Sequence, residues 1–99
     1  MKTLEDAVWQ IMENPAGVVA KIKLENEIEI SIAMNQATYG GRSGLFEICV
    51  FEKDDYAGMK LNCLSGETVD GWLTLADVNQ KIQEIQKELE ERANAKPSH

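Results

Sequence analysis

Few side chains of this sequence could carry out catalysis. The single histidine, His99, is the last residue, and the two cysteines, Cys49 and Cys63, lie within apolar, strand-like runs. A cysteine nucleophile needs an activating base nearby, and cysteine is among the most frequently buried residue types. We therefore predict two reduced core thiols and no enzymatic activity. A redox bridge is the alternative if the strands place Cys49 opposite Cys63.

An acidic segment invites a metal-site hypothesis. Glu52, Asp54 and Asp55 precede Tyr56 at the end of a predicted strand. A calcium loop of the EF-hand type needs oxygen ligands at alternating positions over twelve residues and a closing glutamate, and this spacing is absent. Consecutive carboxylates on a hairpin tip are typical of solvated turns. We predict a turn that meets solvent or a protein partner, and no metal.

A glycine-rich segment, residues 40–44, has the sequence Gly-Gly-Arg-Ser-Gly. Phosphate-binding loops of this composition normally lead into a helix, whose N-terminus carries partial positive charge. This segment leads into a predicted strand instead. We predict an ordinary turn without a cofactor, in which Tyr39 and Arg42 are available for binding.

Charge and hydropathy narrow the range of partners. Seventeen Asp and Glu oppose ten Lys and Arg, which gives a net charge of −7. This balance argues against a broad nucleic-acid interface, which needs clustered basic residues, and fits a basic protein partner or simple solubility. The sequence has no apolar run of membrane-spanning length, and acidic residues near its start are unlike a secretory signal. We expect a cytoplasmic protein.

The pattern of the first half predicts a short helix and a hairpin. Thr3 and Asp6 resemble a capping box, and the apolar spacing of residues 4–12 is helical up to Asn14-Pro15. Alternation then predicts strands over residues 18–24 and 28–34. Because opposed residues face the same side of a sheet, we predict a three-residue loop, Lys23 opposite Glu29 as an ion pair, and Asn26 or Glu27 near the left-handed conformation.

The second half predicts two more strands and a long helix. Residues 45–52 are apolar on both faces, which is typical of a central strand covered twice, and residues 59–64 alternate. A polar loop, residues 65–71, leads to a helix capped by Thr74 and Asp77 with a narrow apolar stripe. The prediction is one α+β domain over residues 1–93, a four-stranded, mainly antiparallel sheet in the order αββββα, followed by a frayed tail over residues 94–99.

Two stretches, residues 39–50 and 71–78, resemble small orphan proteins of phages and prophages. These carry a glycine-rich turn before a Leu-aromatic-Glu strand, and a Gly-aromatic-Leu-Thr entry to a final amphipathic helix. Some small acidic proteins of mobile elements inhibit host defence nucleases, and anti-CRISPR proteins are among them. The resemblance implies a binding function and identifies no catalytic residue.

Two functional hypotheses follow. The first is an acidic phage-type inhibitor whose carboxylates imitate nucleic-acid phosphates and block a basic surface of a host defence protein. The second is an accessory module that forms a homodimer or binds a protein through its apolar sheet face or its last helix, with Phe46, Ile48 and Val50 as the dimer face. The predicted contact residues are Tyr39, Arg42, Glu47, Glu52, Asp54, Asp55 and Tyr56.

Overall fold

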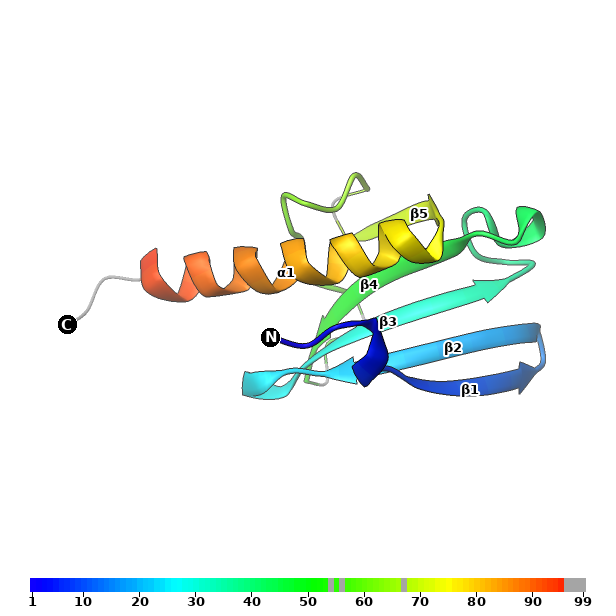
Figure 1. Cartoon of the computed structure of the whole chain (residues 1–99), viewed down its shortest axis with the longest axis horizontal. Helices are drawn as coiled ribbons and strands as arrows, with labels where there is room; N and C mark the ends of the chain where they lie inside the picture. Colours follow the sequence, from blue (N-terminus) through cyan, green and yellow to red (C-terminus); the bar gives the residue numbers. More distant parts are fainter. Residues whose placement is uncertain (54, 56, 67, 96–99) are drawn as a thin grey trace.

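The chain folds into five antiparallel strands that follow one another in sequence order, with one long helix over one face of the sheet (Figure 1). The computed structural model describes residues 1–53, 55, 57–66 and 68–95. The elements are the 3-10 turns η1 (Leu4–Asp6), η2 (Glu25–Glu27) and η3 (Gly41–Ser43), the strands β1 (Val8–Glu13), β2 (Ala16–Lys23), β3 (Ile28–Asn35), β4 (Phe46–Glu52) and β5 (Val69–Leu73), and the helix α1 (Leu75–Ala95). The α+β class is therefore confirmed, with five strands where four were predicted.

The core lies between the sheet and α1. Alternate residues of the three central strands are fully buried on one face, as the period of two requires. The apolar stripe of α1 packs against them through Val78, Ile82 and Ile85. Figure 1 shows α1 lying across β4 and β5, while β1 forms the opposite border of the sheet. The helix thus covers one side of the sheet and leaves the β1 border outside its reach.

The hairpin of β2 and β3 confirms the predicted register. Lys23 lies opposite Glu29, and the backbone N–H of Leu24 donates to the carbonyl of Ile28 at 2.7 Å. Both Asn26 and Glu27 adopt a φ of 60°. The ion pair differs from the prediction, because the Glu29 carboxylate lies 3.8 Å from the diagonal neighbour Lys21.

The start of α1 is the predicted capping box. The Thr74 hydroxyl accepts a hydrogen bond from the backbone N–H of Asp77 at 3.1 Å, and the Asp77 carboxylate accepts one from the N–H of Thr74 at 3.0 Å. Two otherwise unpaired donors are satisfied. The helix continues to Ala95, and residues 96–99 of the predicted tail lie outside the described residues.

The predicted N-terminal helix is wrong. The capping box at Thr3 and Asp6 is present, but it closes only the short turn η1. Residues Val8–Glu13 form β1 instead, and Asn14-Pro15 is the two-residue connection to β2. Val8, Trp9 and Ile11 are branched or aromatic, and such side chains favour strands. The apolar spacing of so short a segment fits a helix and a strand equally, and pairing with β2 decides between them.

The predicted strand over residues 59–64 is also wrong. This segment is a loop in which Leu61 is buried and Met59 and Cys63 are partly buried against the core, so its apolar alternation reflects burial without strand pairing. The fifth strand, Val69–Leu73, lies largely within the segment predicted as a polar loop. Its pattern is concealed because a register shift opposite Phe46 and Ile48 interrupts the alternation.

The two faces of β4 have different environments. Ile48 and Val50 are fully buried beneath α1, so they are unavailable as the predicted dimer face. Cys49 and Phe51 lie on the opposite face and are half-buried. The N-terminal segment does not cover this second face, since η1 lies on the same side as α1 and its Leu4 N–H donates to the Asn79 side chain.

Candidate protein-binding surfaces

The predicted contact residues fall at two ends of the molecule. Tyr39, Arg42 and Glu47 lie at or near the start of β4, and Glu52 and Asp55 lie at its end. Five residues of extended strand span about 17 Å, so the two groups are separate surfaces. Asp54 and Tyr56 lie outside the described residues.

The first group contains an aromatic pair that the sequence analysis did not find. Tyr39 and Trp72 are 60% and 63% exposed, and the Trp72 N–H donates to the Tyr39 carbonyl at 3.1 Å. A Cβ at Gly71 would collide with the Tyr39 Cβ, so only glycine permits this approach. The Gly-Trp sequence before α1 was the available signal, but only the turn of the chain brings it to Tyr39.

The glycine-rich loop supports the turn interpretation. Gly40 and Gly44 have φ angles of 87° and 75°, which favour glycine. The N–H groups of Ser43 and Leu45 both donate to the carbonyl of Gly40. These donors are therefore used within the loop. Glu47, predicted as a contact residue, accepts a hydrogen bond from the Tyr39 N–H at 3.3 Å and helps to hold the same loop.

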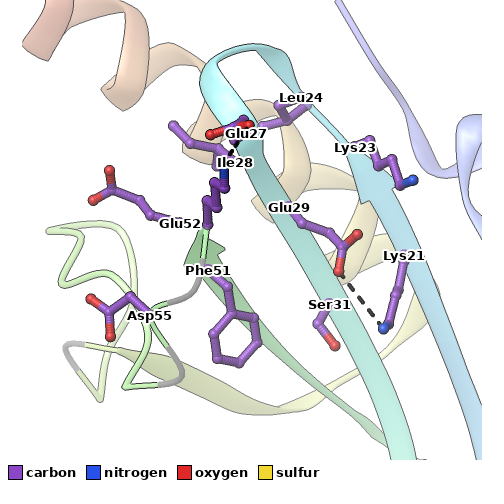
Figure 2. Close-up of a pocket in the computed structure, with 11 residues that line it drawn as sticks. Lys21, Lys23, Leu24, Glu27, Ile28, Glu29, Ser31, Phe51, Glu52 and Asp55 are labelled. Atoms are coloured by element: carbon purple, nitrogen blue, oxygen red, sulfur yellow. Dashed lines mark ion pairs between the residues drawn. The ribbon is translucent and has the colours of Figure 1, made fainter.

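The second group borders a groove of about 490 Å³ on the sheet face opposite α1. Figure 2 shows Glu52 and Asp55 at its side, with Phe51 and Ser31 near the Lys21–Glu29 pair. Lysines share this groove with the carboxylates, and the Lys53 ammonium lies 3.3 Å from Glu27. The acidic surface is therefore partly neutralised where the predicted contacts Glu52 and Asp55 lie.

Several carboxylates serve the fold. The Glu88 carboxylate accepts hydrogen bonds from the N–H groups of Asn62 and Cys63 at 2.8 and 2.9 Å. Burial raises the pKa of Glu88, but these hydrogen bonds and nearby Arg92 outweigh it and lower the pKa overall. Asp70 behaves likewise: burial raises its pKa, and hydrogen bonds from Ser65 and Lys81 bring it below the usual value. Part of the negative charge thus anchors loops.

The two thiols are separate and favour the protonated form. Cys49 lies opposite Ser31 and Val69 in the sheet, so the arrangement in which it faces Cys63 is wrong, and both cysteines are free. Burial, with Glu47 nearby, raises the pKa of Cys49 to about 11, and burial together with Glu88 raises that of Cys63 to about 11. Both remain protonated at neutral pH, and a thiol is a weak nucleophile.

The border strand β1 is a further surface that the sequence analysis did not find. All six of its residues are exposed, and it pairs only with β2 in the described sheet. Val8 and Ile11 are 70% and 85% exposed. Trp9 points to the α1 side, where its ring meets Phe46 edge to face at 5.9 Å. The segment that was predicted as part of a helix is therefore an exposed edge strand with apolar side chains.

Comparison of the chain with protein-family models, curated proteins and solved structures finds no match. The similarity to phage proteins therefore stays a prediction. Within the described part of the chain, no three His, Cys, Asp or Glu side chains gather where they could hold a metal ion. None of the described helices combines the length and apolar composition needed to span a membrane.

Proposed function

We propose that this chain is a non-enzymatic interaction protein that docks another polypeptide strand along the open edge of β1. The observation that carries the proposal is the exposure of all six residues of β1. Residues 8–12 contain no charge. The unpaired N–H and C=O groups of such an edge can hydrogen-bond to an added strand.

The chemistry of an uncovered edge strengthens this proposal. Soluble proteins usually protect edge strands with lysine, proline, a bulge or a covering loop, because bare apolar edges pair with other chains. β1 pairs with β2 at six successive positions without a register shift. Its one charged residue, Glu13, is the last of the strand. A regular apolar edge of this kind suits strand addition better than exposure to water.

Two properties of the cysteines support a non-catalytic role inside a cytoplasm. A thiol with a pKa of about 11 is a weak nucleophile at neutral pH. Free cysteines suit a reducing compartment. In this proposal the carboxylates, several of which hold loops, provide solubility and structure.

A second candidate function is the phage-type inhibitor of a basic, nucleic-acid-binding surface on a host defence protein. The observation that favours it is the gathering of Glu27, Glu52 and Asp55 at one groove (Figure 2), on a chain with a net charge of −7. Tyr39 and Arg42 would extend the contact from the other end of β4. Such binding is electrostatic and weakens with salt.

A capture experiment separates the two candidates. Tagged wild-type chain, Ile11→Lys and the double variant Glu52→Lys/Asp55→Lys are each incubated with untagged chain and host lysate at about 0.05 and about 0.5 M salt. We expect Ile11→Lys to lose the captured polypeptide at both salt concentrations, and the double variant to retain it. If only the double variant fails to capture the polypeptide, and capture by wild type disappears at high salt, the electrostatic inhibitor is the correct candidate instead.

A further inference from the structure

The open edge of β1 is complementary to itself. We propose that β1 pairs antiparallel with β1 of a second copy of this chain, so that two sheets join into one ten-stranded sheet with both α1 helices on the same side. This inference rests on the proposed function, because it names the strand that occupies the edge.

The faces of the sheet restrict the register. Trp9 lies opposite the fully buried Ala20, so Trp9 and Ile11 point to the α1 side, while Val8, Gln10 and Met12 point to the other side. In a joined sheet, opposed residues must face the same side. The two copies are related by a two-fold axis normal to the sheet. This axis must therefore pass beside one residue, which lies opposite the same residue of the second copy.

Only one of these registers pairs the uncharged residues 8–12 exclusively with one another, with Glu13 opposite Ala7 of the second copy. With the axis beside Gln10, Trp9 lies opposite Ile11 of the second copy and Val8 lies opposite Met12 of the second copy. An axis one residue later would place Glu13 opposite Trp9. An axis one residue earlier would bring Asp6 opposite Met12. The Gln10 register alone matches all five uncharged residues with one another.

The pairs in this register are favourable. Aromatic and branched side chains opposite one another stabilise antiparallel strands, and the row Ala20, Trp9, Ile11, Val18 is apolar throughout. At the axis, the Gln10 amide both donates and accepts hydrogen bonds, so two glutamines can satisfy each other. A second copy therefore supplies a partner for each side chain of residues 8–12.

The remaining edges explain why assembly ends at two copies. Pairing of both β1 strands leaves only β5 at each border of the joined sheet. The pairing of β5 with β4 contains a register shift, and Trp72 within β5 has a φ of 59°. An irregular edge resists further pairing. The buried area is on the order of 1,000 Å², which lies at the lower limit for a specific interface.

Sedimentation of the purified chain tests the dimer directly. We expect wild type to be dimeric at about 100 µM, as suits an interface of this size. Ile11→Lys should raise the dissociation constant on the order of 100-fold, because two buried apolar contacts are lost and two charges are introduced. Trp72→Lys places the same charge on the other edge and should leave the constant unchanged. Circular dichroism confirms that each variant is folded.

Disulfide cross-linking tests the register. In a background of Cys49→Ser and Cys63→Ser, Gln10→Cys places two thiols opposite each other across the axis. Opposed residues in antiparallel strands have Cα atoms about 5 Å apart, within the range of a disulfide. We expect rapid dimer formation by Gln10→Cys on oxidation, and at most slow cross-linking by the matched control Glu13→Cys.

Salt gives an independent readout. Both copies carry a charge of −7, so screening their repulsion should leave the dimer unchanged or strengthen it. A strictly monomeric wild type, a dimer abolished by Trp72→Lys but not by Ile11→Lys, or equal cross-linking at positions 10 and 13 would overturn the inference. A monomer that still captures a different protein through β1 in the lysate experiment would leave the proposed function standing. Loss of that capture would remove the proposed function as well.

Discussion

The two edge strands of this sheet are built in opposite ways. β1 is regular, pairs at six positions with β2, and exposes every residue. β5 pairs with β4 at three positions with a register shift, contains the buried Asp70, and continues directly into the cap of α1. One edge is open to another strand, whereas the other is integrated into the core.

This difference reflects where α1 and the loop over residues 57–66 lie. Lys81 on α1 lies 3.3 Å from the Asp70 carboxylate and also donates to the Cys63 carbonyl. Glu88, two turns further along α1, holds the same loop by two backbone N–H groups. The β5 border is therefore stabilised by contacts within one chain. At the β1 border, by contrast, the apolar side chains of Val8 and Ile11 stay exposed.

The largest expected contrast is between a buried isoleucine and an exposed one. Ile82→Ala removes a fully buried side chain between α1 and the sheet and should lower the free energy of unfolding by about 3 kcal/mol. Ile11→Ala on the open edge should change it by less than about 0.5 kcal/mol. Urea unfolding of dilute protein measures both. A similar loss in Ile11→Ala would show that the β1 edge is closed within the monomer.

An intermediate effect is expected at the loop anchor. Glu88→Ala leaves the N–H groups of Asn62 and Cys63 without their carboxylate partner and should lower the free energy of unfolding by about 1–2 kcal/mol. Glu91→Ala changes an exposed residue of the same helix and serves as the control. Hydrogen exchange at residues 62 and 63 should accelerate in Glu88→Ala. Unchanged exchange there would contradict the anchoring role.

The smallest effect concerns pH at the β5 border. Because the pKa of Asp70 is lowered in the folded state, its contribution to stability is present above the ordinary carboxyl pKa of about 4. The contribution is lost as the pH falls through the lower, folded value. Asp70→Asn should therefore flatten the acid limb of the stability–pH profile. Parallel profiles for Asp70→Asn and wild type would contradict this.

The sequence predicted those elements in which local rules and tertiary packing agree. The β2–β3 register followed from side-chain parity, and the start of α1 followed from Thr74 and Asp77. The wrong predictions for residues 8–12 and 59–64 arose where local rules and tertiary packing disagree. Residues 8–12 satisfy helical and strand spacing equally, and residues 59–64 alternate because a loop turns Met59, Leu61 and Cys63 toward the core. Burial patterns alone do not reveal which backbone groups pair.

The candidate surfaces were predictable where their residues lie close together in the sequence. Tyr39 and Arg42 belong to the glycine-rich loop, and Glu52 and Asp55 border the groove of Figure 2. The sequence did not indicate that Trp72 lies beside Tyr39. These residues are 33 positions apart, and only the fold brings them together. It also did not indicate that lysines share the acidic groove.

By itself, the sequence determined that this protein has a single histidine, a charge of −7, a β2–β3 hairpin of fixed register and a capped amphipathic helix. These properties depend on residue types and on contacts between near neighbours. Only the tertiary structure decided that residues 8–13 form an edge strand, that α1 covers the opposite border, and that apolar side chains remain exposed on β1. The reason is physical: whether an apolar segment becomes core or interface depends on what the rest of the chain places over it.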